Sequence, residues 1–73
     1  MEETIRSAGF VFQYHQWMKS DPRGGDYGLF VAYSDDYRVG VHKYRLNEFH
    51  QMTLAYTLSM SAESFAAWAE DCT

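Results

Sequence analysis

The chain has 73 residues and a net charge of −4, and 47% of its side chains are hydrophobic and 18% aromatic. A chain this short is expected to fold as one domain, 1–73, that buries only about 60% of the surface its unfolded form exposes, so its core has to be small and dense. The aromatic content excludes intrinsic disorder. The acidic balance disfavours nucleic acids and anionic lipids as partners.

The start of the chain, the lack of a long apolar run and the single cysteine indicate the cellular compartment. The start, Met-Glu-Glu, lacks the positive region of a secretory signal, and no apolar run approaches the roughly 20 residues that cross a bilayer. The single cysteine, Cys72, excludes an intrachain disulfide and fits a reducing compartment. We therefore expect a cytoplasmic protein that makes no membrane contact.

Residues 1–8 mix acidic, hydroxyl and basic side chains, and three alternatives stay open for them: a flexible arm, one helical turn or the start of the first strand. The aromatic and β-branched run 10–18 then predicts a strand. A helix is the main rival, because apolar residues of this run also recur at helical spacing. Gly9 and the dense Phe-Val-Phe run favour the strand.

The rest of the sheet is predicted from turn residues and alternation. The proline and glycines of 19–26 are typical of a connecting loop. A tight acidic turn at 34–36 and a break at Asn47-Glu48 separate the strands that follow. Those strands are predicted at 27–33, 37–46 and 49–60, the last of which alternates large apolar with small or hydroxylated residues from Met52 onward.

The pattern changes at Ser61 from a period of two to the period of a helix. Phe65, Trp68, Ala69 and Cys72 then share one stripe. Ser61 is suited to cap the helix, and Glu63 lies at its positive end. The predicted fold is α+β: a four-stranded antiparallel meander sheet with one C-terminal helix packed on one face.

One face of such a sheet stays uncovered. We expect the helix to cover Phe12, Tyr14, Leu29, Val31, Val39, Val41, Leu54 and Leu58. Alternation then leaves uncovered Val11, Gln13, His15, Trp17, Phe30, Ala32, His42, Tyr44, Thr53, Ala55 and Thr57. A patch with Trp17, Phe30 and Tyr44 exceeds what a small monomer usually exposes, which predicts a dimer interface or a partner site. The alternatives are scattered surface aromatics or a one-residue register error.

The polar residues do not predict a reaction. His15, His42 and His50 match no metal-binding spacing, and the loop carboxylates match no calcium loop. The acidic residues fall at opposite ends of the predicted sheet, which is typical of solvated turns. No catalytic residue, metal or cofactor is therefore predicted, and an acidic rim at Asp35 and Asp36 is suited to a basic partner surface.

The sequence thus favours a non-enzymatic protein–protein interaction module that binds either a second copy, as a homodimer, or a host protein. The predicted partner-binding residues are Val11, His15, Trp17, Phe30, His42, Tyr44, Asp35 and Asp36. Tiny acidic, aromatic-rich domains are frequent among phage and mobile-element accessory proteins that inhibit host proteins, which is an analogy at the level of a class. The alternative is a single-stranded nucleic-acid-binding domain that stacks bases on sheet aromatics.

Overall fold

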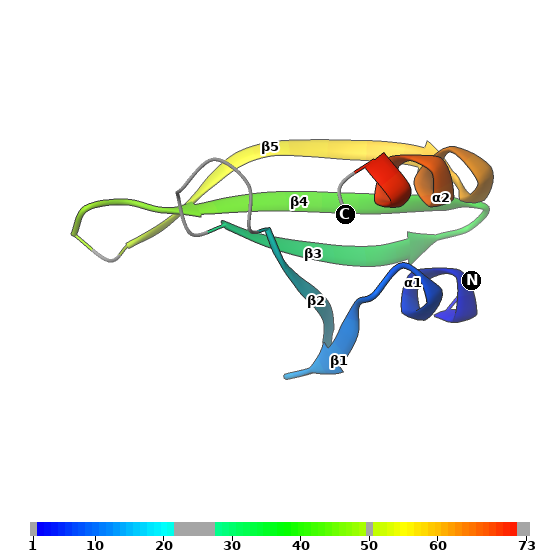
Figure 1. Ribbon diagram of the computed structural model, residues 1–73, viewed down its shortest axis with the longest axis horizontal. Helices are drawn as coiled ribbons and strands as arrows, with labels where there is room; N and C mark the ends of the chain where they lie inside the picture. Colours follow the sequence, from blue (N-terminus) through cyan, green and yellow to red (C-terminus); the bar gives the residue numbers. More distant parts are fainter. Residues whose placement is uncertain (1, 22–27, 50, 72–73) are drawn as a thin grey trace.

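The computed structural model describes residues 2–21, 28–49 and 51–71. Within these ranges the elements are α1 (Glu2–Ser7), β1 (Val11–Gln13), β2 (Gln16–Asp21), β3 (Gly28–Asp35), β4 (Arg38–Leu46), β5 (Met52–Ser61) and α2 (Ala62–Asp71). The described strands form one antiparallel sheet in the order β1-β2-β3-β4-β5 (Figure 1). The predicted α+β class and meander are confirmed, but the sheet has five strands where four were expected.

The additional strand arises because the run 10–18 is a hairpin and not a single strand. The chain reverses at Tyr14 and His15, whose φ angles are 53° and 63°, and Gln13 pairs with Gln16. A two-residue loop with positive φ at both positions is a type I′ turn, which normally contains Asn-Gly. The expected loop at 19–26 is also wrong at its start, because β2 continues to Asp21. The rest of that predicted loop, from residue 22 on, lies outside the described residues.

Residues 2–7 form helix α1 and are not a flexible arm. Two acidic residues occupy its first turn and Arg6 its last, which matches the helix dipole. The helix ends at Gly9, whose φ is 95° and whose N–H donates to the Arg6 carbonyl over 3.0 Å. Lys19 Nζ donates to the Ala8 carbonyl over 2.8 Å. Ile5 is fully buried, so α1 contributes to the core.

Helix α2 begins as the sequence predicts. The Ser64 backbone N–H donates to Ser61 Oγ over 3.2 Å, which is the hydrogen bond of an N-cap. Glu63 lies in the first turn, and Phe65 and Ala69 face the sheet and are buried. Cys72, which was expected on the same stripe, lies outside the described residues.

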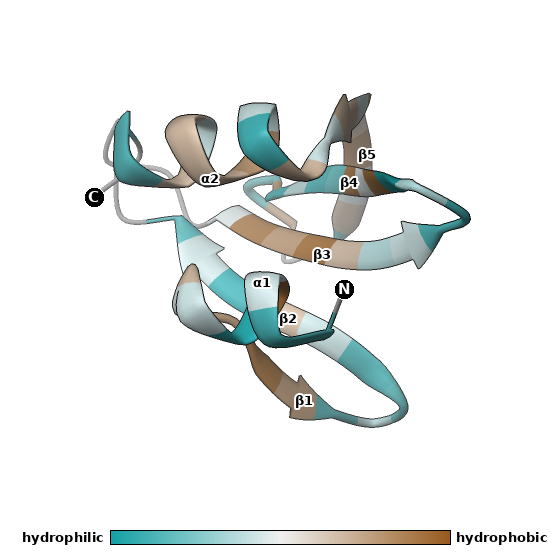
Figure 2. Ribbon diagram, turned by 90° about the vertical axis from the view of Figure 1, so that its right-hand side faces the viewer, coloured by the Kyte–Doolittle hydropathy of each residue, from teal (hydrophilic) through white to brown (hydrophobic). Residues whose placement is uncertain are grey.

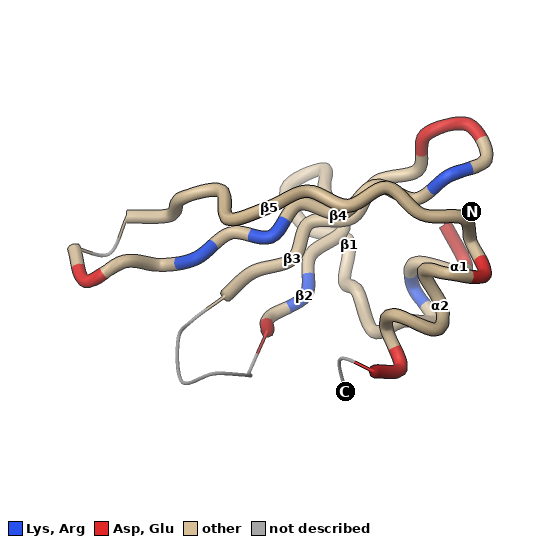
Figure 3. Tube along the Cα trace, turned by 90° about the horizontal axis from the view of Figure 1, so that it is seen from above, with Lys and Arg blue, Asp and Glu red and all other residues tan. Residues whose placement is uncertain are grey.

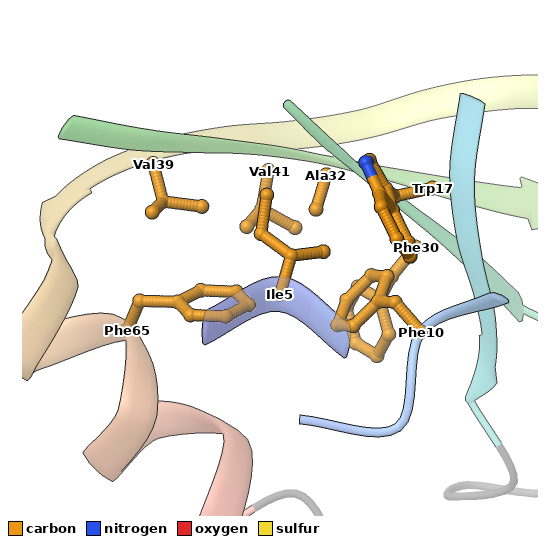
Figure 4. Packing of buried hydrophobic residues seen from close by; sticks show 8 residues of the cluster. All are labelled: Ile5, Phe10, Trp17, Phe30, Ala32, Val39, Val41 and Phe65. Atoms are coloured by element: carbon orange, nitrogen blue, oxygen red, sulfur yellow. The ribbon is translucent and has the colours of Figure 1, made fainter. Parts of the chain in front are cut away.

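Both helices pack on one side of the sheet, which we call the covered face. Ile5 and Phe65, from the two helices, meet Phe10 and the strand side chains Trp17, Phe30, Ala32, Val39 and Val41 in one cluster (Figure 4). The ring of Trp68 stands edge-on to the ring of Phe30, with 5.0 Å between their centroids. Leu58 and Met60 of β5 pack against the cluster and are partly buried.

The covered face also holds a buried ion pair. Lys43 Nζ donates to Asp21 Oδ2, and both side chains are 7% exposed. The ammonium lies 4.5 Å from the centroid of the Phe30 ring, where the negative face of an aromatic ring attracts a cation. The pair therefore joins the end of β2 to β4 at the border of the apolar cluster.

Candidate protein-binding face

The opposite side of the sheet, which we call the open face, has no described helix over it. Its members follow from the pairing register, because directly opposed residues share a face. Val11 pairs with Met18, Met18 with Val31, and Val31 with His42. The apolar and aromatic members of the open face are Val11, Met18, Leu29, Val31, Tyr33, His42, Tyr44, Leu46, Met52 and Leu54.

Three aromatic side chains line up along the middle of this face. The His42 ring lies 5.2 Å from the ring of Tyr33 and 6.3 Å from that of Tyr44, with the second pair stacked at an interplanar angle of 15°. Tyr33 pairs with Gly40 across the β3–β4 ladder, and its ring occupies the space that a side chain on Gly40 would need. The glycine thus lets the tyrosine ring lie flat on the sheet.

A hollow of about 390 Å³ adjoins this aromatic row. Its lining includes His15, Gln16, Val31, Tyr33, His42 and Tyr44 and one carboxylate, that of Glu2 in α1. His42 Nδ1 is buried and has no hydrogen-bond partner among the described residues. No hydrogen bond in the described part joins either histidine of this lining to a carboxylate or a hydroxyl, so the hollow lacks the contacts of an acid–base or nucleophilic pair.

The far end of the open face extends along the β4–β5 hairpin, at the left of Figure 1. Met52 and Leu54 are each about half exposed, at 51% and 53%. At the tip, Asn47 Oδ1 accepts hydrogen bonds from the backbone N–H groups of Phe49 and Gln51, each over 2.9 Å. The Asn47 side chain thereby holds a turn on which Phe49 is 74% exposed.

The open face carries almost no charge. Among the described strand residues, Asp35 and Arg38 are its charged members; they pair at the end of the β3–β4 hairpin and cancel in net charge. Arg38 Nε donates to Ser59 Oγ over 2.9 Å, and Arg38 Nη2 donates to the Ser59 carbonyl over 2.8 Å. The other described acidic residues lie on the helices, at turns or on the covered face (Figure 3).

The predicted site residues divide between the two faces. Val11, His42 and Tyr44 lie on the open face as expected, and His15 lines the hollow from the neighbouring turn. Asp35 and Asp36 are exposed at the β3–β4 turn. The expected exposure of Trp17 and Phe30 is wrong, because they are 9% and 2% exposed and belong to the core.

The remaining face assignments are corrected in the same way. Leu29, Val31 and Leu54 lie on the open face, Tyr14 lies in a turn, and Ala32 and Thr53 are on the side of the helices. Phe12 pairs with Trp17 and lies on the side of the helices as predicted, although its side chain is 55% exposed. Val39, Val41 and Leu58 lie on the covered face as predicted. The open face is therefore apolar and aromatic as expected, but largely through other residues than those predicted. Figure 2 shows the consecutive apolar residues of β3 as a brown stretch of this strand.

The described residues form neither a metal-binding cluster nor a membrane-spanning helix. No group of three or more His, Cys, Asp and Glu side chains there is placed to hold a metal ion. Neither α1 nor α2 is long and apolar enough to cross a membrane. The groove between these helices, about 500 Å³, is lined by small residues and by Glu3 and Glu70.

No protein-family model, curated protein or solved structure matches this chain.

Proposed function

We propose that this protein is a non-catalytic interaction module whose open face binds another protein surface. The observation that supports this most is the composition of the described part of that face, where ten apolar or aromatic side chains are accompanied by one acidic and one basic residue and by six uncharged polar ones, Gln13, Gln16, Ser20, Thr57, Ser59 and Ser61. A sheet face that stays in water normally carries polar and charged side chains. A contiguous apolar patch of this kind marks an interaction site.

The residue types on the open face, and not only its low polarity, suit a protein partner. Tyrosine and methionine are enriched in the buried centres of protein interfaces, and charged residues are depleted there. Tyr33, His42 and Tyr44 already contact one another, so little side-chain freedom remains to be lost on binding. A domain that covers part of its partner in this way acts by occlusion, so we propose inhibition of a host protein as the consequence of binding.

The row of three rings also supports a second candidate, the stacking of single-stranded bases. Such sites combine stacking with a cationic groove, because phosphates have to be neutralised. Within the described part of the chain, the open face offers only Arg38 for this, and that guanidinium is already bonded to Ser59. We therefore rank nucleic acid below protein.

The proposal is tested by comparing what variants of the immobilised chain retain from a cell extract. Tyr44→Glu places a charge in the middle of the open face, and Ala66→Glu places the same charge in the groove between the helices. We expect proteins retained by the original chain and by Ala66→Glu to be lost from Tyr44→Glu. Identical retention by all three, with unchanged circular dichroism, would reject the open face as the binding surface.

A titration with a mixed-sequence oligonucleotide addresses the second candidate. Quenching of tryptophan fluorescence that weakens with added salt would favour the nucleic acid, and its absence would remove that candidate.

A further inference from the structure

We infer that the open face is completed by the open face of a second copy, which lies across it about a twofold axis. The inference rests on the proposed function, because it names the partner of the same face. In such a dimer the two sheets stack face to face with the helices on the outside. The charge, the shape and the size of the face each support this occupant.

The charge distribution favours a second copy. The chain as a whole has a net charge of −4, so most surfaces of two copies repel one another. The open face is the exception, because Asp35 and Arg38 cancel and no other described strand residue of this face is charged, although Glu2 of α1 also lines the hollow. Two copies therefore approach through this face without opposing like charges. A partner that binds through opposite charge would instead require a net charge on the open face.

The shape of the face is suited to twofold contact. The hollow extends along β3 and β4 from Tyr33 to Tyr44, and Leu54 of β5, which is 53% exposed, pairs with Tyr44 at its border. A twofold axis that lies in the plane of the face and passes between Val31 and Leu54 exchanges these two positions, so that Leu54 of each copy lies over the hollow of the other. The same patch then serves both subunits, as an isologous interface requires.

The size of the face is also adequate. The two longest extents of the molecule are 36 and 25 Å, and Figure 1 is viewed down the shortest axis, roughly along the normal of the sheet. A standard stable interface takes about 800 Å² from each partner. A rectangle with these two extents has an area of that order, so a dimer of standard size uses nearly the whole of this face.

The edge of β5 is the competing surface for self-association, because Met52–Ser61 contains no charged residue. Two features oppose pairing there. The register jumps from Lys43–Tyr56 to Tyr44–Leu54, so Ala55 is a bulge residue. Arg38 donates to the carbonyl of Ser59. Bulges and charged side chains at an edge strand are devices that prevent edge-to-edge pairing.

The test is the solution mass, measured by sedimentation equilibrium from micromolar to millimolar protein. We expect the chain to form a dimer, and Leu54→Glu and Val31→Lys each to raise the dissociation constant at least about tenfold. An equimolar mixture of the two variants restores a heterodimer. In that heterodimer, one of the two symmetry-related contacts places the introduced glutamate against the introduced lysine. The other contact keeps the original Leu54 and Val31.

Two controls make the outcome decisive. Ala66→Glu, in the groove between the helices, and Tyr56→Lys, on the helix side of the β5 edge, leave the open face unchanged and should keep the dimer. A chain that stays monomeric at the highest concentration overturns the inference. So does a dimer that Tyr56→Lys dissociates and Val31→Lys does not.

The inference and the proposed function fail separately. If the chain is a monomer and its open-face variants still retain fewer proteins from an extract than the original chain, the proposed function stands. The second copy is then refuted as the partner of the open face. Circular dichroism of each variant shows whether it is folded, so that a loss of mass is not confused with unfolding.

Discussion

The two faces of the sheet have similar side chains and different surroundings. On the covered face, Phe30, Val39 and Val41 are at most 2% exposed because α1 and α2 lie over them. On the open face, Leu29, Val31 and Tyr44 have comparable size and are only partly buried. Burial of the first set stabilises the monomer. The apolar area of the second set remains available for association, which is where we place the function.

The largest expected change in stability distinguishes two adjacent residues of β3. Phe30→Ala should destabilise the protein by about 3 to 5 kcal/mol, because it leaves a cavity among Trp68, Val41 and the other core side chains. Val31→Ala, on the open face, should cost less than about 1 kcal/mol. Urea denaturation at low protein concentration measures both. Equal costs would show that the open face belongs to the monomer's own core.

The buried ion pair gives the next largest effect. Lys43→Met should cost about 3 kcal/mol, because it removes the ammonium from beside the buried carboxylate of Asp21. The double variant Lys43→Met/Asp21→Leu should recover more than half of that loss, since apolar side chains of similar size then replace both charges. Thermal denaturation compares the two. A double variant less stable than Lys43→Met would mean that Asp21 stabilises the fold through its other contacts.

The smallest effect concerns the aromatic row. Gly40→Ala should cost about 1 kcal/mol, because the new methyl group displaces the Tyr33 ring and breaks its contact with His42. In a Tyr33→Ala background the same substitution should cost nothing, since alanine is a better strand residue than glycine. The difference between the two backgrounds is a double-mutant cycle. Equal costs would show that the ring does not depend on the glycine.

The strand order from β3 to α2 was predictable because strong local signals mark it. Residues 52–60 alternate, and Ser61 supplies a cap that the structure contains. Helix α1 also had signals, two acidic residues at its start and Gly9 at its end, but six residues are too few to favour a helix without tertiary contacts. Its burial through Ile5 depends on β3, which local sequence does not reveal.

The error in the candidate site has two geometric sources, the register of β3 on β4 and the reversal of the chain at Tyr14 and His15. A turn at 34–36 places Tyr33 opposite Tyr37, whereas the structure pairs Tyr33 with Gly40. The two registers differ by an odd number of residues, so every side chain of β3 changes face relative to β4. The composition of β3 did not correct the error, because Leu29, Phe30, Val31 and Ala32 are all apolar. In the first hairpin, Tyr14 and His15 have no turn preference that would reveal the reversal.

The position of Ile5 and Phe65 in one cluster has a consequence for how the chain folds as it is synthesised. Each strand pairs with the strand made just before it, so the ladders of the meander can form while the chain emerges. The core lacks Phe65 until sixty residues after Ile5 have been made. We therefore expect a ribosome-bound chain that stops at residue 61 to carry an unclosed sheet sensitive to protease. A chain extended through α2 should become resistant.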